Sequence, residues 1–180
     1  HAKSATFRTA DVVGLDTLRH VTANLYDAIP EDESRDRFQV PDILQRLVDL
    51  KQLGAKSKAG FYMKDGKTIK SIDPETMEYQ EPGEMGFDIG PFKKAGDLPA
   101  RLKALWADDG KAGRFFRETT LDLIGYTARR TPEISDSPSN IDRALQWGFG
   151  WEMGPYQIWD VLGIDAVRDA LAEDGIDVPD

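Results

Sequence analysis

Apolar residues recur at helical spacing from Thr6 to Tyr26 and are interrupted once, by Gly14. This pattern predicts a short helix followed by a longer one, because a glycine after a run of helical residues is a common helix end. Asp16 is placed to be the N-cap of the longer helix, since its carboxylate can accept an N–H of the first turn. The face of that helix expected to be buried holds Leu18, Val21 and Leu25.

A second helical pattern begins at Pro41, a residue that suits the first turn of a helix. A charged connector that starts at residues 30–33 separates it from the preceding helix. Gly54 is the expected C′ residue at its end. The apolar stripe expected to be buried consists of Ile43, Leu44, Leu47 and Val48.

The period then changes from that of a helix to that of strands. Residues 60–72 predict a β-hairpin in which Asp65 and Gly66 form a two-residue type I′ turn, because both central positions of that turn need positive φ. Residues 73–79 predict a second turn whose last three residues form a third strand. A stretch rich in glycine and proline, residues 82–96, predicts a connector.

Helical periodicity resumes at Asp97, the expected N-cap ahead of Pro99. A longer helix is predicted over residues 112–130, and Pro155 is expected to begin the final helical region. The residues of the longer helix expected to be buried are Phe115, Phe116, Leu123, Ile124 and Tyr126, or a subset of these.

One stretch near the start of the chain recurs near its end. Residues 6–18 align without a gap on residues 155–167. Four pairs are identical: Asp11 and Asp160, Val12 and Val161, Gly14 and Gly163, and Asp16 and Asp165. Each copy predicts a short helix stopped by a glycine and a longer helix after it. A long helical sequence precedes the second copy but only residues 1–5 precede the first, so the first unit is expected to lack its leading helices.

Together these patterns predict a mainly α-helical protein of two related helical units with a small β-hairpin or meander insertion. An incomplete first helical unit is expected over residues 1–56 and the β excursion over residues 57–82. A linker over residues 83–97 would then lead to the second helical unit, residues 98–180. The chain therefore has the pattern of a piece of something longer.

Composition argues against several classes of function. The 180 residues include 32 Asp and Glu against 23 Lys and Arg, and the net charge of −9 disfavours nucleic acid as a partner. The absence of cysteine excludes disulfides, thiol nucleophiles and cysteine-based zinc sites. No apolar run approaches the roughly 20 residues of a membrane span. No secretory signal precedes the first helix, so a cytoplasmic location is expected.

Few side chains are candidates for catalysis or metal binding. Asp16, four residues before His20 on one helix face, could orient it as a base, but no Gly-x-Ser-x-Gly motif supplies a nucleophile. A histidine at the helix surface or core edge is the favoured interpretation. Asp136 and Asp142 are interpreted as helix caps. Four acidic residues could ligate a hard cation but lack the spacing of a calcium loop, so a solvated helix start is favoured for Glu31, Asp32, Glu33 and Asp36.

The segment from Gly148 to Gly154 has the glycine content of a dinucleotide-binding loop. Its spacing is wrong, it follows a helix rather than a strand, and it places bulky Trp151 where the backbone must approach a pyrophosphate. A tight helix–helix turn is therefore predicted. Core or subunit interface is favoured over an acyl pocket for the surrounding aromatic residues, Trp147, Phe149, Trp151, Tyr156 and Trp159.

Three long motifs cover much of the chain. They are KSATFRTADVVGLDT at residues 3–17, KSKAGFY at residues 56–62 and IDRALQWGFGWEMGPYQIWD at residues 141–160. Together they resemble the C-terminal helical region of L-3-hydroxyacyl-CoA dehydrogenases. DPETMEY at residues 73–79 and DDGKAGRF at residues 108–115 are similar to the long bacterial β-oxidation enzymes that also carry an enoyl-CoA hydratase domain.

This resemblance implies a fold like the C-terminal domain of 6-phosphogluconate dehydrogenase, within an enzyme that oxidises L-3-hydroxyacyl-CoA with NAD in fatty-acid metabolism. In that family the catalytic His–Glu pair and the NAD glycine loop belong to an N-terminal Rossmann domain. None of those motifs has a matching position here, so no catalytic, cofactor-binding or metal-binding residue can be transferred to this chain.

The resemblance also implies what the helical region would contribute. It would form walls of the acyl-CoA groove, contact the missing Rossmann domain of the same chain and provide a homodimer surface. Alone, it is expected to bind no NAD and to be inactive. The alternative is a non-catalytic assembly module that reuses the same helical fold.

Overall fold

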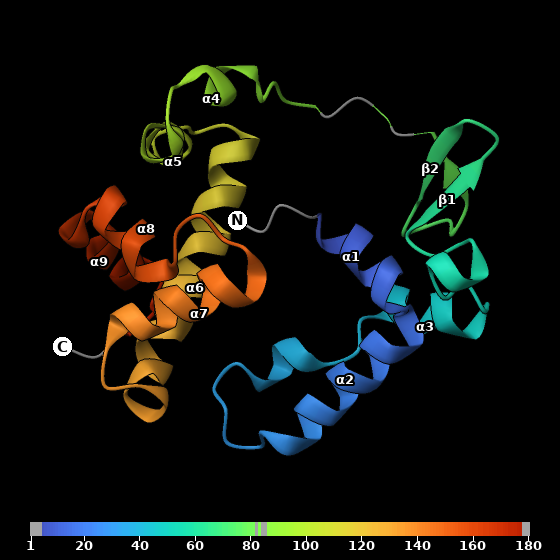
Figure 1. Cartoon of the computed structure of the whole chain (residues 1–180), viewed down its shortest axis with the longest axis horizontal. Coiled ribbons are helices and arrows are strands. Elements are labelled where there is room, and N and C mark those ends of the chain that lie inside the picture. Colours follow the sequence, from blue (N-terminus) through green and yellow to red (C-terminus); the bar gives the residue numbers. More distant parts are fainter. Residues whose placement is uncertain (1–4, 82, 84–85, 178–180) are drawn as a thin grey trace. The chain divides into compact units, whose positions relative to one another are not determined.

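A computed structural model describes residues 5–81, 83 and 86–177. The chain divides into an N-terminal unit, which ends before residue 85, and a C-terminal unit that follows it (Figure 1). Helices dominate both units, and the N-terminal unit also contains a three-stranded antiparallel sheet in the order β1-β2-β3. The predicted fold class, mainly α-helical with a small β insertion, is therefore confirmed.

The N-terminal unit packs three α-helices and the sheet around one small core. That core consists of the buried residues Ala10, Leu15, Leu44, Leu47, Phe61 and Ile72. The elements in chain order are α1 (Thr6–Val13), α2 (Leu15–Ala28), the 3-10 helix η1 (Arg35–Phe38), α3 (Asp42–Asp49), the 3-10 helix η2 (Ala55–Ser57), β1 (Tyr62–Asp65), β2 (Thr68–Ile72) and β3 (Tyr79–Gln80).

The predicted buried face of α2 is only partly correct. Leu18 packs against the core of this unit, but Val21 is 50% exposed and Leu25 is also exposed. Within this unit α2 packs against α1, α3 and η1. Within the N-terminal unit these elements leave much of the apolar face around Val21 and Leu25 exposed.

Gly54 does not end α3, contrary to the prediction. The helix ends at Asp49, and Lys51 takes the left-handed conformation just after it, with φ 60°. Gly54 also has positive φ, 91°, and it lies so close to α1 that a Cβ there would collide with the main chain of Asp11. The glycine is therefore explained by close backbone approach rather than by helix termination.

The hairpin forms as predicted, but its turn is shifted by one residue. Asp65 pairs with Thr68, so the two-residue loop is Gly66–Lys67. Gly66 has φ 59° while Lys67 has no positive φ, which fits a turn with glycine at its first central position better than a type I′ turn. The second turn is confirmed, with Asp73 Oδ1 accepting hydrogen bonds from two following amides.

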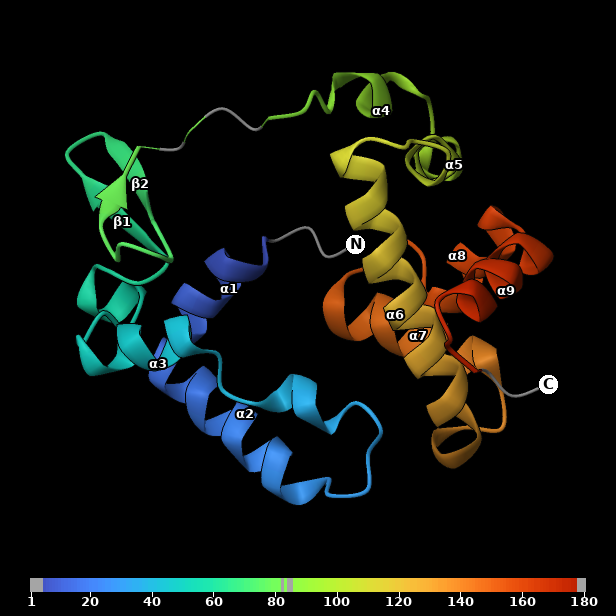
Figure 2. The same cartoon turned by 180° about the vertical axis from the view of Figure 1, so that it is seen from behind.

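The C-terminal unit is built around its longest helix, α6, with α8 and α9 along one side of it (Figures 1 and 2). Its buried core consists of Leu102, Phe116, Leu121, Ile124, Ile158, Leu162, Val167 and Leu171. The elements are α4 (Gly90–Lys94), α5 (Leu98–Trp106), α6 (Lys111–Ile134), α7 (Pro138–Phe149), α8 (Pro155–Leu162) and α9 (Ile164–Glu173).

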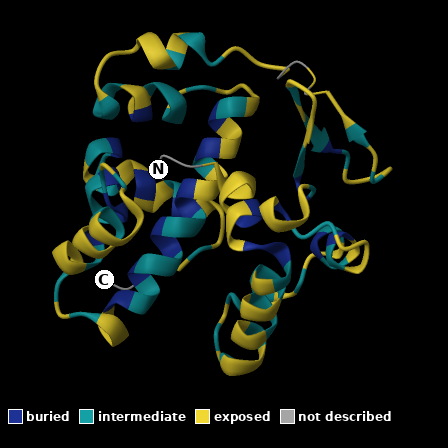
Figure 3. Ribbon diagram, turned by 45° about the vertical axis from the view of Figure 1, so that its right-hand side comes forward, coloured by how far each residue is buried: buried dark blue, intermediate teal, exposed yellow. Residues whose placement is uncertain are grey.

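Burial along α6 follows one side of the helix (Figure 3). Phe116 and Ile124 are buried as predicted, and Leu121 joins them. Phe115, in contrast, is exposed, because it lies one residue away from Phe116 and therefore on a different face. At the preceding helix, Asp97 is the N-cap of α5 as predicted and accepts a hydrogen bond from the amide of Ala100 at 3.0 Å.

The repeated sequence has the same local structure in both units. An eight-residue helix, α1 or α8, is followed at once by a second helix, α2 or α9. The joining glycines have nearly identical conformations, with φ 101° and ψ 126° at Gly14 and φ 99° and ψ 124° at Gly163. Residues with a Cβ rarely adopt this combination of φ and ψ, so a glycine is needed between the two helices in both copies.

The glycine-rich segment between α7 and α8 is the predicted helix–helix turn. The helix α7 ends at Phe149, and Gly150 caps it in the left-handed conformation with φ 65°. Gly154 directly precedes α8 and lies against Asp142 of α7, where a Cβ would collide with the aspartate side chain. Gly148 has open space around it.

We predict opposite effects of alanine at these two glycines. Gly154→Ala should lower the free energy of unfolding by about 2 kcal/mol or more, because the new methyl group must displace Asp142 or α8. Gly148→Ala, the matched control within α7, should raise it by up to about 1 kcal/mol. Urea unfolding followed by circular dichroism measures both, and equal losses would contradict the close approach at Gly154.

Candidate functional site

The carboxylate of Asp11 joins α1 to the start of β1. Asp11 is 5% exposed, and its two oxygens accept hydrogen bonds from the amides of Phe61 at 2.8 Å and Tyr62 at 2.9 Å. Gly60 makes the approach possible, since a Cβ there would collide with the same carboxylate. Charge-assisted hydrogen bonds of this kind are stronger than neutral ones, so this contact fixes two distant segments together.

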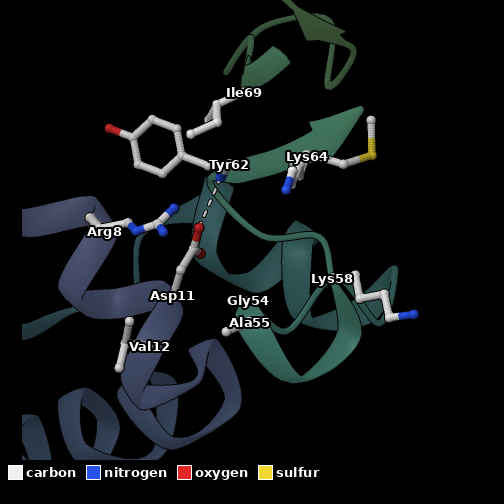
Figure 4. A pocket seen from close by; sticks show the side chains of 10 residues that line it. Arg8, Asp11, Val12, Gly54, Ala55, Lys58, Tyr62, Lys64 and Ile69 are labelled. Atoms are coloured by element: carbon white, nitrogen blue, oxygen red, sulfur yellow. Dashed lines mark hydrogen bonds between the residues drawn. The ribbon is translucent and has the colours of Figure 1, made fainter. Parts of the chain in front are cut away.

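A pocket of about 380 Å³ lies beside this contact, between α1, η2 and the β1–β2 hairpin (Figure 4). Its lining is mainly apolar, with contributions from Val12, Ala55, Met63 and Ile69. The pocket therefore has the apolar composition of a binding site, and the described residues of its lining include no serine, threonine, cysteine or histidine.

Three cationic residues, Arg8, Lys58 and Lys64, also line the pocket. Among the residues that the structure describes, none of the three forms an ion pair, and the Asp11 carboxylate is directed at backbone amides. Figure 4 shows Arg8 extending toward Asp11 and Tyr62, while Lys58 points away from the other labelled side chains. The charge at the pocket is thus positive, within a chain whose net charge is −9.

Asp16 is not the N-cap of α2, contrary to the prediction, and it does not pair with His20, which is exposed on the helix surface as the favoured interpretation has it. It lies in the first turn of α2, whose N-cap position is Gly14, and both its oxygens accept hydrogen bonds from Lys56 Nζ at 2.6 Å. This bond from Lys56 is the main reason that the pKa of Asp16 is lowered. His20 Nε2 instead lies 3.1 Å from Arg19 Nη2, so no oriented base is present here.

The other acidic candidates do not assemble into a metal site. Within the described residues, no group of three or more His, Cys, Asp or Glu side chains is placed to hold a metal ion. Asp32 accepts a hydrogen bond from the amide of Ser34, and Asp36 accepts one from the Gln39 side chain. Both carboxylates therefore take part in local hydrogen bonds of the connector.

Asp142 is a helix cap, but for the neighbouring helix rather than its own. It is buried on α7, and its Oδ1 accepts a hydrogen bond from the amide of Tyr156 in the first turn of α8, at 2.9 Å. Burial raises the pKa of Asp142, opposed by the hydrogen bonds from Tyr156 and Gln157. Asp136 is exposed and lies just before Ser137, the residue at the N-cap of α7.

The aromatic residues near the glycine-rich turn divide into two groups. Trp151 and Trp159 pack against the core of the C-terminal unit. Tyr156 stacks on Trp159 with ring centroids 6.2 Å apart, and its hydroxyl donates to Thr131 Oγ1 at 2.7 Å. Trp147, 81% exposed, and Phe149 have no such cover. Part of the predicted aromatic cluster is therefore core, and part lies at the surface.

The pocket and its cations were not anticipated from the sequence. One signal was present, because residues 51–70 contain six lysines and a single acidic residue in an otherwise acidic chain. The role of Asp11 had no such signal. Its repeat partner Asp160 is exposed, so identity between the two copies does not show which aspartate has a buried role.

Comparison with known proteins gives consistent matches over both units. A family model described as 3-hydroxyacyl-CoA dehydrogenase, C-terminal domain, matches residues 2–64 and 121–176. A probable 3-hydroxyacyl-CoA dehydrogenase of Bacillus subtilis is 41% identical over 98% of this chain and 22% of its own length. A putative fatty acid oxidation complex trifunctional enzyme of Rickettsia felis is 24% identical over 88% of this chain and 21% of its own length.

The chain spans about a fifth of the length of these two relatives. A probable 3-hydroxyacyl-CoA dehydrogenase of Deinococcus radiodurans is 43% identical over a shorter stretch, 35% of this chain and 17% of its own length. No solved structure matches.

Asp11→Asn should destabilise the N-terminal unit by about 2 kcal/mol. The asparagine side chain has one acceptor oxygen and one NH₂ group. Either the amide of Phe61 or that of Tyr62 would therefore face the NH₂ group, which is a donor, and lose its hydrogen bond. Asp160→Asn is the matched control, because Asp160 is the repeat equivalent of Asp11 and is exposed; it should change stability by less than about 0.5 kcal/mol. Equal effects in chemical unfolding would show that the buried contact contributes little.

Lys56→Gln should return the pKa of Asp16 toward its ordinary value of 3.8, since the bond from Lys56 is the largest cause of the lowered pKa. In the wild type, the contribution of this pair to stability is present above pH 3.8 and is lost as the pH falls through the lowered pKa. Carboxyl NMR titration measures the shift. Lys58→Gln is the control, and an unchanged Asp16 pKa in Lys56→Gln would mean that backbone amides alone hold it down.

Proposed function

Because the chain belongs to the 3-hydroxyacyl-CoA dehydrogenase family, through that family's C-terminal domain, we propose that it is the C-terminal helical region of an NAD-dependent L-3-hydroxyacyl-CoA dehydrogenase of fatty-acid oxidation. The observation that carries the proposal is the match to the Bacillus subtilis relative, which extends over 98% of this chain but only 22% of that protein. The remaining four-fifths of such a protein has room for a Rossmann domain.

In the proposed parent enzyme, bound NAD would supply the hydride-accepting chemistry for oxidation at the hydroxyl-bearing carbon, and a histidine would take the hydroxyl proton. The residues of this chain do not fit the NAD site. The one glycine-rich segment with a superficial likeness, Gly148 to Gly154, joins two helices, and no strand precedes it. The Rossmann domain would therefore hold both NAD and the catalytic pair.

The contribution of this chain would be binding surface. Large exposed apolar side chains occur in both units, including Phe7 and Val13 in the N-terminal one and Phe115, Trp147 and Phe149 in the C-terminal one. Exposed aromatic side chains are common where a surface contacts another domain or subunit. They support contacts with the Rossmann domain, with the acyl-CoA groove and with a second subunit in a homodimer.

The proposed location is the cytoplasm. None of the described helices combines the length and apolar character that crossing a membrane requires. A non-catalytic assembly module is the second candidate function, and the exposed apolar side chains of both units support it.

Two measurements on the native protein test the proposal. An antibody against this chain should detect a polypeptide several-fold larger than 20.1 kDa, and that polypeptide should reduce NAD in the presence of L-3-hydroxybutyryl-CoA. The 180-residue chain is the control and should form no NADH. A native polypeptide of 20.1 kDa that forms no NADH would overturn the proposal in favour of the assembly module.

A further inference from the structure

A second pocket, of about 420 Å³, lies within the C-terminal unit, where the segment leading into α4 meets α5 and the first half of α6 (Figure 1). Two of the aromatic side chains around it, Phe87 and Phe115, are exposed. Covering large apolar side chains of this kind is favourable. The apolar part of the lining consists of Phe87, Ile89, Leu105, Ala112, Phe115 and Phe116.

A single positive charge lies at this apolar pocket. Among the described residues that line it, Lys111 alone is ionisable, and none of the described residues forms a hydrogen bond or ion pair with the Lys111 side chain. Lys111 is in the first turn of α6, where the helix dipole adds partial positive charge. The Asp88 carboxylate accepts the amide of Gly90 at 2.7 Å. The Asp108 carboxylate accepts the amide of Gly113 at 2.8 Å. The ammonium group is therefore available to an anion.

The connection between α5 and α6, beside the pocket, is held by one arginine. Arg117 Nη1 donates to the carbonyl of Trp106 at 2.6 Å and to the carbonyl of Asp108 at 2.7 Å. Arg117 Nη2 lies 3.7 Å from a carboxylate oxygen of Asp109. These bonds fix the end of α5 against α6, and a pocket with ordered walls loses less conformational entropy when it binds a ligand.

The charge and part of the apolar surface follow one face of α6. Lys111, Phe115 and Thr119 are spaced four residues apart, so they share a face over about 12 Å of the helix axis. The Thr119 hydroxyl donates to the carbonyl of Phe115 at 2.8 Å and is therefore already used within the helix. A ligand that fits must carry a negative group at one end and an apolar chain that extends away from it.

We propose that this pocket binds a free fatty acid of medium chain length. Lys111 would pair with the carboxylate, and Phe115 and Phe116 would contact the alkyl chain. A carboxylate suits the site better than a phosphate, because the described lining contains no arginine, whose planar array of N–H donors matches phosphate oxygens. This goes beyond the proposed function, because the ligand carries no coenzyme A and the site belongs to the C-terminal unit alone.

Three small molecules test the two parts of the site separately. Decanoate, butanoate and decylamine would each be added to the 180-residue chain while amide NMR signals and binding heats are recorded. Decanoate should bind saturably and shift the amides of Ile89, Ala112 and Thr119. Butanoate should bind more weakly because it lacks most of the alkyl chain. Decylamine should also bind more weakly, because its ammonium group is repelled by Lys111.

Substitutions of lysine test the charge. Lys111→Gln should weaken binding of decanoate about tenfold, the effect of losing one charge-assisted hydrogen bond. Lys111→Arg should retain most of the affinity, since it keeps the positive charge. Lys103→Gln is the matched control, because Lys103 is exposed on α5 and does not line the pocket; it should leave the affinity unchanged.

Substitutions of phenylalanine test the apolar contact. Phe115→Ser should weaken binding of decanoate about tenfold, because the alkyl chain loses apolar surface to cover. Phe149→Ser is the matched control, since Phe149 is outside the pocket and has the same exposed fraction as Phe115, 68%. It should leave the affinity unchanged. Unfolding midpoints of all variants show whether each is folded.

Several results would overturn the inference. They are the absence of saturable binding at millimolar decanoate, equally tight binding of decylamine, and a loss in Phe149→Ser as large as that in Phe115→Ser. Sedimentation tests a different occupant, because a dimer that Phe115→Ser dissociates and decanoate does not affect would assign the pocket to a second copy of the chain. Since binding is measured on the chain alone, a negative result leaves the activity expected of the parent enzyme untouched.

Discussion

The N-terminal unit depends on one buried carboxylate. Burial removes the Asp11 carboxylate from water, and two backbone amides at the start of β1 replace the lost hydrogen bonds to water. Burial of this charged group is favourable only if both of these hydrogen bonds form. Its position requires Gly54 and Gly60 to approach without side chains. The same contact turns the negative charge of Asp11 inward, so the neighbouring pocket keeps the positive charge of Arg8 and Lys64. Asp11 therefore contributes both to the packing of this unit and to the charge of the neighbouring pocket.

The C-terminal unit uses a similar device at a different position. Asp142 of α7 is also buried, and its carboxylate accepts a hydrogen bond from the amide of Tyr156. The absence of a side chain at Gly154 leaves space for the Asp142 carboxylate. Asp142 is not the repeat equivalent of Asp11, which is the exposed Asp160. The two copies of the repeat have the same backbone conformation at the joint between their helices. The buried aspartates that connect distant segments within each unit, however, lie at positions that are not equivalent in the repeat.

Local features of the fold could be predicted from the sequence, and distant contacts could not. The cap at Asp97, the hairpin and the turn before Pro155 depend on neighbouring residues, and each is present in the structure. Asp11 meets residues fifty positions away, so no local pattern reveals its role. The exposed face of α2 shows the converse, because apolar spacing indicates a face that can be buried without showing that the chain supplies its cover.

The matching joints at Gly14 and Gly163 have a consequence for how such a protein can change over evolutionary time. Both joints have nearly the same φ and ψ although most of the flanking side chains differ. The bend between the two helices is thus encoded by one residue rather than by the packing around it. The surrounding surfaces are free to diverge without altering the bend, so one copy could acquire a cationic pocket while the other retained a closed apolar core.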